Sequence, residues 1–266
     1  MTVVIGTGSV VTYLVCALLV GKQLTKDQGY RVVASLAFLA LTLHSTVLYQ
    51  DIVTEHGLNL GFFNAASLTT WVVAVLLSIT TLAQPVLTLG IFVWPLAAVG
   101  VLSTMIFTHQ TQAVDATIGV QTHVVVSIIA YGVLTIAACQ AVALAIQDRS
   151  LRKHQSHPFV DVLPPLKTQE RILFQLLSVG FFLLSMSLIS GMMFVEDMFA
   201  QHLTHKTFLA FIAWLVFGVL LWGRWHSGWR GRTAIRWSLS GFALLLLAYF
   251  GAKLVLEVIL GRVWTS

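Results

Sequence analysis

Three histidines lie within or at the mouths of strongly apolar segments, and their side chains have the clearest capacity for chemistry. They are His44, His123 and His205. A neutral imidazole can bind a metal ion or a heme iron through one ring nitrogen. We therefore expect His123 and His205 to be metal ligands at a common site, with His44 as a third candidate. The alternative that stays open is that each histidine only satisfies a structural hydrogen bond.

A polar stripe accompanies one of these histidines. His123, Ser127, Tyr131 and Thr135 recur at intervals of four residues, which places them near one face of a helix. In an apolar bundle such a face is expected to point inward. Tyr131 is then a candidate to donate a hydrogen bond to a bound ligand. The alternative is that the stripe provides hydrogen bonds between helices, each contributing about 0.6 kcal/mol.

One more ionisable side chain, Lys253, is a candidate for binding. It precedes Glu257 by four residues, a spacing at which side chains of opposite charge can pair on a helix. The competing interpretation is that Lys253 faces an anionic ligand, such as a propionate group of heme.

The composition determines what kind of chain positions these residues. Only 9% of its 266 residues are charged and 58% are hydrophobic, whereas an ordinary soluble domain has about 25% charged residues. A soluble fold of this size cannot cover its surface with so few charges. The composition excludes a soluble enzyme, a nucleic-acid-binding domain and a disordered chain, and it indicates a multi-pass membrane protein.

Apolar runs predict an all-α bundle of eight transmembrane helices. One span needs about 20 residues, so eight spans fit the chain and leave no room for a separate soluble domain. We expect one integral-membrane domain over residues 1–266. A seven-span arrangement is the main alternative, because only Ala83-Gln84-Pro85 separates the third and fourth runs. The predicted spans are Val3–Val20, Val32–Gln50, Phe62–Leu82, Val86–Phe107, Val120–Ile146, Ile172–Val195, Thr207–Gly223 and Trp237–Leu260.

Charge in the connecting loops predicts the orientation of the spans. The first, fifth and seventh loops are cationic, whereas the second, fourth and sixth carry acidic residues and few cations. Cationic loops remain on the cytoplasmic side. With eight spans, both termini then lie on the outer side. His44, His123 and His205 fall in or near the outer half of the bundle.

Several short segments resemble the cytochrome c assembly membrane protein family, and in particular its HemX/YpjD-like inner-membrane branch. The resemblance covers nearly the whole chain. The block Gly228-Trp229-Arg230-Gly231-Arg232 is its most specific element. The other segments are Gly57-Leu58-Asn59-Leu60 with Asn64 and Ser67, His123 with Tyr131, His205-Lys206-Thr207 with Ala213-Trp214-Leu215, Leu220-Leu221-Trp222-Gly223, and Ala248-Tyr249-Phe250-Gly251.

The resemblance implies heme binding or handling on the periplasmic side of the bacterial inner membrane, in cytochrome c biogenesis or tetrapyrrole regulation. It implies non-covalent heme as the cofactor, with the lipid bilayer and other membrane or cytochrome-assembly proteins as partners, and no nucleic acid. Cytochrome c synthetases of this family bind heme at a tryptophan-rich outer segment between histidines. Here no tryptophan lies between Phe194 and Lys206, and Trp222 stands where a membrane histidine is expected. We therefore expect no enzymatic activity.

Two other functions remain open. One is a scaffold or accessory subunit that stabilises another membrane protein and binds no heme. The other, less favoured, is a small-solute transporter, which would favour inverted repeats. The sequence shows no internal repeat.

Overall fold

The computed structural model describes residues 2–22, 27–54, 57–59, 61–107, 117–154, 158–194 and 201–251. Within these ranges, the side chains of residues 27–28, 54, 57–58, 158 and 201–206 are not described. The chain divides into two compact units, which meet in sequence between Asp115 and Ala116. The expectation of one domain over residues 1–266 stays a prediction.

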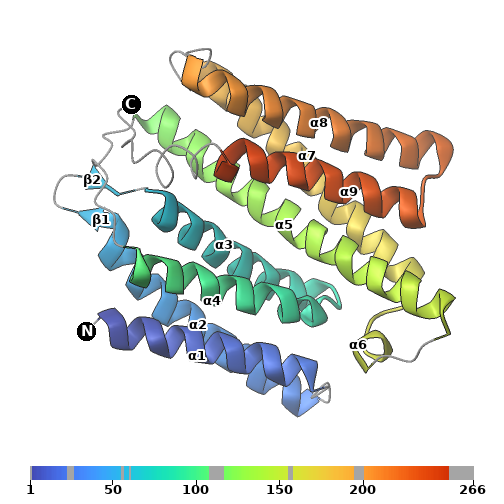
Figure 1. Cartoon of the computed structure of the whole chain (residues 1–266), viewed down its shortest axis with the longest axis horizontal. Coiled ribbons are helices and arrows are strands. Elements are labelled where there is room, and N and C mark those ends of the chain that lie inside the picture. Colours follow the sequence, from blue (N-terminus) through green and yellow to red (C-terminus); the bar gives the residue numbers. More distant parts are fainter. Residues whose placement is uncertain are drawn as a thin grey trace. The chain divides into compact units, whose positions relative to one another are not determined.

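The first unit is a four-helix bundle (Figure 1). Helix α1 packs against α2 and α4, and α3 packs against α2 and α4, which closes a ring. A short antiparallel pair of strands, β1 and β2, follows α2, and a 3₁₀ turn, η1, leads into α4. The elements are α1 (Thr2–Gly21), α2 (Asp27–Ile52), β1 (Val53–Thr54), β2 (Gly57–Leu58), α3 (Phe62–Ala83), η1 (Leu87–Leu89) and α4 (Gly90–Ile106).

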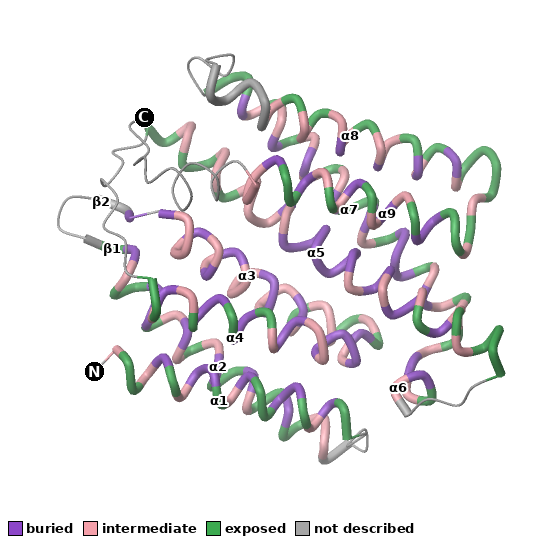
Figure 2. The backbone as a smooth tube through the Cα atoms, viewed as in Figure 1, coloured by how far each residue is buried: buried purple, intermediate pink, exposed green. Residues whose placement is uncertain are grey.

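The second unit repeats this arrangement, and three of its helices, α5, α7 and α8, are longer than any helix of the first unit. Helix α5 packs against α7 and α9, and α8 packs against α7 and α9. Figure 2 shows that the middle of α5 is buried, in agreement with its run of buried residues from Ala130 to Leu144. The elements are α5 (Ile118–Arg152), α6 (Pro158–Asp161), α7 (Leu166–Phe194), α8 (Gln201–Ser227), α9 (Gly231–Leu246) and the π-helical turn η2 (Leu247–Gly251).

The prediction of eight spans is confirmed. In the described part of the chain, eight helical segments are long and apolar enough to cross a membrane. The third and fourth are separate helices, because the chain bends between Ala83 and Leu87. The seven-span alternative is therefore not supported. The paired strands β1 and β2, only two residues each, are the one departure from an all-helical fold in the described residues.

Helix ends differ most from the sequence prediction in the second unit. Helix α5 continues to Arg152, α7 begins at Leu166 and α9 begins at Gly231. Apolar runs miss these ends because the last turns of α5 and the first turns of α7 and α9 contain Arg, Lys and Gln. Long polar side chains at a helix end can reach the membrane interface while the backbone stays helical. The fifth and seventh loops are accordingly shorter than predicted.

Three buried glutamines fix the connection between α5 and α7. The side chain of Gln140 donates to the Gln169 side-chain oxygen at 3.0 Å, and Gln169 donates to the Gln147 side-chain oxygen at 2.5 Å. Gln147 and Gln169 both donate to the carbonyl oxygen of Pro164 at 3.2 Å. This network satisfies buried amides and anchors the segment that precedes α7.

Candidate functional site

His123 lies in the second turn of α5 and is half-buried against α7. Its Nδ1 atom is 3.0 Å from the carbonyl oxygen of Ser187 and 3.1 Å from the hydroxyl oxygen of Ser190. The Ser190 hydroxyl itself donates to the Ser187 carbonyl at 3.0 Å, so its oxygen can accept from the ring. Both contacts therefore place a proton on Nδ1.

This hydrogen bond determines the chemistry available to the ring. A carbonyl oxygen can only accept, so the neutral His123 ring carries its proton on Nδ1 and keeps a lone pair on Nε2. Among the described residues, Nε2 has no hydrogen-bond partner. A histidine held through Nδ1–H by a backbone carbonyl is the usual arrangement of a metal-binding imidazole.

A partly open cavity of about 260 Å³ lies beside this ring, lined by residues of α5, α7, α8, α9 and η2. Most of its wall is apolar, with polar groups from the histidine, serine and tyrosine side chains. The lining residues are His123, Val124, Ser127, Ile128, Tyr131, Leu184, Ser187, Leu188, Gly191, Thr207, Ala210, Leu245, Ala248 and Tyr249. The predicted polar stripe of α5 therefore faces inward through His123, Ser127 and Tyr131.

Tyr131 joins α5 to the end of α9. Its hydroxyl donates to the carbonyl oxygen of Leu245, two residues before η2 begins, and its ring lies 5.6 Å from that of Tyr249. A phenol has one proton to donate, so Tyr131 in this arrangement can only accept a hydrogen bond from a ligand. Its contact with α9 agrees with the alternative in which the stripe provides hydrogen bonds between helices. Binding of a ligand by Tyr131 stays a prediction.

Ser127, one turn after His123 on α5, contacts Ser187 of α7. Their hydroxyl oxygens are 2.7 Å apart, and the Ser127 hydroxyl is also 2.6 Å from the carbonyl oxygen of His123. Ser187 and Gly191 are small residues four positions apart, a pattern that allows close helix approach. That spacing is a signal in the sequence that α7 packs closely against another helix. It does not reveal that the Ser187 carbonyl oxygen accepts the hydrogen bond from His123.

His44 occupies a different setting in the first unit. The residue is fully buried. Its Nδ1 is 3.2 Å from the Tyr13 hydroxyl, and its Nε2 is 2.9 Å from the Ser67 hydroxyl. The Tyr13 ring stacks on Trp94 at 6.0 Å. Both ring nitrogens are therefore engaged by the bundle, and a ligand could reach His44 only after one of these bonds broke.

The family-like segment that begins at Gly57 also builds local structure. The Asn59 side-chain oxygen accepts from the Gly61 amide at 3.2 Å. The Asn64 side chain donates to the carbonyl oxygens of Asp51 and Asn59, both at 3.1 Å. These bonds fix the segment that leads into α3, the helix whose Ser67 contacts His44.

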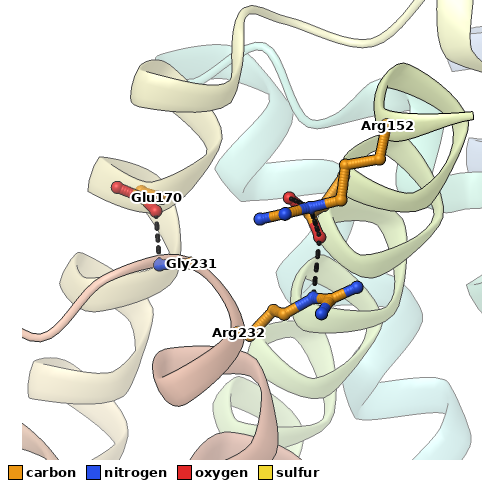
Figure 3. Close-up of polar contacts among 5 residues, drawn as sticks. Arg152, Glu170, Gly231 and Arg232 are labelled. Atoms are coloured by element: carbon orange, nitrogen blue, oxygen red, sulfur yellow. Dashed lines mark hydrogen bonds and ion pairs between the residues drawn. The ribbon is translucent and has the colours of Figure 1, made fainter. Parts of the chain in front are cut away.

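The block from Gly228 to Arg232 forms the tight turn between α8 and α9. Gly228 and Gly231 have φ angles of 64° and 53°, which favour glycine. The Trp229 indole packs so closely on Gly223 that a Cβ atom there would lie 2.5 Å from it. The Gly231 amide donates to a carboxylate oxygen of Glu170 at 2.7 Å (Figure 3). The pattern thus has a structural explanation.

Two predicted site residues lie outside this description. His205 is in the first turns of α8, but its side chain is among those not described, and Lys253 follows the last described residue. Their pairing with His123 or with a ligand stays a prediction. Among the described residues, no group of three or more His, Cys, Asp or Glu side chains could hold a metal ion.

Comparison with known proteins places the chain in a family. The model of the family described as Cytochrome C assembly protein matches residues 32–260. The inner membrane protein YpjD of Escherichia coli K12 is 32% identical over 91% of this chain and 94% of its own length. The cytochrome c biogenesis protein CcsA of Synechocystis is 29% identical over 40% of this chain and 33% of its own length. No solved structure matches.

Both the family match and the YpjD match span most of the chain, and the YpjD match covers nearly all of that relative. The relative is an inner membrane protein, and the structure has eight helical segments that could cross a membrane within its described residues. The chain is therefore a multi-pass inner-membrane protein that belongs to the cytochrome c assembly protein family.

Proposed function

We propose that this protein binds heme non-covalently in the cavity beside His123, in the service of cytochrome c biogenesis or tetrapyrrole regulation. The observation that carries the proposal is the Nδ1–H bond from His123 to the Ser187 carbonyl, which leaves a lone pair on Nε2 of a residue that lines the cavity. The proposed role is binding, without catalysis.

The residues present suit such a ligand. The mostly apolar wall matches a porphyrin, and heme would supply an iron centre to which an imidazole nitrogen bonds. His123 would hold it from α5, with His205 as the proposed second ligand and Lys253 as the proposed partner of a propionate. Membership of the cytochrome c assembly family supports the same ligand, since a matching relative is a cytochrome c biogenesis protein.

An absorption spectrum of the purified protein, with and without reductant, tests this proposal. We expect heme bands in the wild type, and a loss of at least half of the bound heme in His123→Ala because an axial ligand is removed. We expect a similar loss in His205→Ala. His154→Ala is the matched control, because His154 lies in the turn after α5 and outside the cavity lining. Equal heme content in His123→Ala and His154→Ala would exclude the proposed ligand.

We also propose that both termini and the His123 end of α5 face the periplasm. The cationic loops that support this orientation are those after the first, fifth and seventh spans. Reporter fusions after Gln110 and Thr204 should read as periplasmic, and fusions after Gln155 and Gly228 as cytoplasmic. A cytoplasmic signal at Thr204 would contradict the arrangement.

The second candidate function is a scaffold that stabilises another membrane protein. The size of the cavity favours it, because about 260 Å³ lies just below the range of about 300–1,000 Å³ typical of ligand pockets. A wild-type protein without heme bands after reconstitution with hemin would favour the scaffold over heme binding.

A further inference from the structure

A second cavity, of about 440 Å³, lies at the other end of α5. We call it the basic cavity. Five of its eight lining residues are cationic, and they come from the last turns of α5 and the first turns of α9. The lining residues are Ala145, Asp148, Arg149, Arg152, Lys153, Arg232, Ile235 and Arg236.

The charges in the basic cavity do not balance. Asp148 is the only acidic residue of the lining, and it accepts from the Nε atoms of Arg152 at 3.0 Å and Arg232 at 3.3 Å. The Asp148 carboxylate thus orients two guanidinium groups, that of Arg152 from α5 and that of Arg232 from α9 (Figure 3). Five cations and one carboxylate leave an excess of four positive charges.

The arrangement leaves donors available for an anion. Because Asp148 uses the Nε atoms, the Nη groups of Arg152 and Arg232 have no partner among the described residues. Arg149, Lys153 and Arg236 form no ion pair there either. Arginine presents planar, forked donors that match the oxygen atoms of a phosphate group.

The position along the helix places this cavity at a membrane surface. His123 and Arg149 are 26 residues apart on α5, about 39 Å at 1.5 Å per residue, which exceeds the hydrocarbon thickness of about 30 Å. Helix α8 ends at Ser227, just before α9 begins at Gly231. Near this end of α8, the side chains of Trp222 and Trp225 are 61% and 82% exposed. Exposed tryptophans and arginines together are typical of the headgroup layer.

We propose that the basic cavity binds a phosphate-bearing anion at the membrane surface. Basic pockets between transmembrane helices recognise the headgroups of anionic phospholipids, and a soluble phosphate compound offers the same chemistry. The site is separate from the cavity beside His123 and does not depend on heme binding.

Native mass spectrometry of the purified full-length protein tests this inference. The protein is incubated with dioleoyl phosphatidylglycerol or with dioleoyl phosphatidylcholine, and retained lipid is counted. We expect selective retention of phosphatidylglycerol, and a loss of about 25-fold in affinity for Arg149→Gln/Arg236→Gln, since each of the two cations near an anionic surface contributes roughly fivefold. The matched control is Arg171→Gln/Arg230→Gln, which removes two exposed arginines of the same unit from outside the lining.

A second arm separates the two sources of phosphate. Pyrophosphate is added to the wild type, and its effect on lipid retention and on the melting temperature is measured. Retention of phosphatidylglycerol that pyrophosphate does not displace identifies a lipid headgroup. Stabilisation by pyrophosphate without selective lipid retention identifies a soluble phosphate compound.

The proposal fails if neither anion is bound, or if the Arg149→Gln/Arg236→Gln variant binds as the control does. Should that variant not fold, Arg149→Lys/Arg236→Lys keeps the charge but removes the forked donors. The proposal would also be overturned if this lysine variant bound the anion as tightly as the wild type does and if salt did not weaken that binding.

Discussion

His44 and His123 both lie within membrane-spanning helices, but the protein surrounds the two rings differently. Hydroxyl groups from α1 and α3 engage both nitrogens of His44, in the fully buried centre of the first unit. His123 is held through Nδ1 alone, at the edge of a cavity in the second unit. A histidine whose two nitrogens are satisfied holds helices together, whereas one with a free nitrogen can also bind a ligand.

The largest effect that would test this contrast is on stability. His44→Ala should lower the free energy of unfolding by about 3 kcal/mol, because it opens a cavity and leaves the hydroxyls of Tyr13 and Ser67 without their shared partner. Denaturation of the purified protein in detergent measures this change.

Thr42→Ala is the control for His44→Ala, since Thr42 lies on the exposed face of α2 and bonds only to its own helix. His123→Ala should cost clearly less stability than His44→Ala, because His123 is half-buried. If both histidine variants were equally destabilised, the distinction between a structural and a binding histidine would not hold.

An intermediate effect is expected at the wall of the cavity. Tyr131→Phe removes the hydroxyl that ties α5 to the carbonyl of Leu245, and should cost about 1 kcal/mol. Hydrogen exchange should also quicken at the end of α9, which loses this contact. Tyr49→Phe changes an exposed tyrosine of α2 and should leave both measurements unaltered. Unchanged exchange in α9 would argue against a positioning role for Tyr131.

The smallest effect concerns the support of His123. Ser187→Ala removes the hydroxyl contact with Ser127 and should cost about 0.6 kcal/mol, the average for such bonds between transmembrane helices. Heme content should stay at the wild-type level, because the acceptor for His123 is the Ser187 backbone carbonyl, which alanine keeps. Ser178→Ala, whose hydroxyl bonds within α7, provides the comparison. A large loss of heme in Ser187→Ala would show that the side chain matters more than the carbonyl.

The sequence predicted the eight spans and the inward face of α5, because both follow from local periodicity. It did not predict the partners of His44, since Tyr13 lies 31 residues before it and Ser67 lies 23 residues after it. Only packing of separate helices brings them together. The pairing of His123 with His205 depends equally on packing, and it stays a prediction.

The basic cavity shows another limit of sequence reasoning. In the sequence, the cations around Arg149 and Arg232 indicate the cytoplasmic side of the membrane but do not predict a cavity. Their spacing along two helices held a further signal, because Arg149 and Lys153, like Arg232 and Arg236, are four residues apart and share a helix face. Which helices would bring these faces together could not be deduced from spacing alone.

The glutamine network that anchors the segment before α7 has a consequence for how the second unit responds to its surroundings. Amide groups do not titrate and carry no net charge, so the bonds among Gln140, Gln147 and Gln169 should persist across pH and ionic strength. The ion pairs of the neighbouring basic cavity are exposed and are weakened by salt. At the end of α5, the glutamine hydrogen bonds should therefore keep their strength as salt concentration changes, whereas the ion pairs of the basic cavity should weaken. A change in the charge interactions of the basic cavity should then leave the packing of α5 against α7 intact.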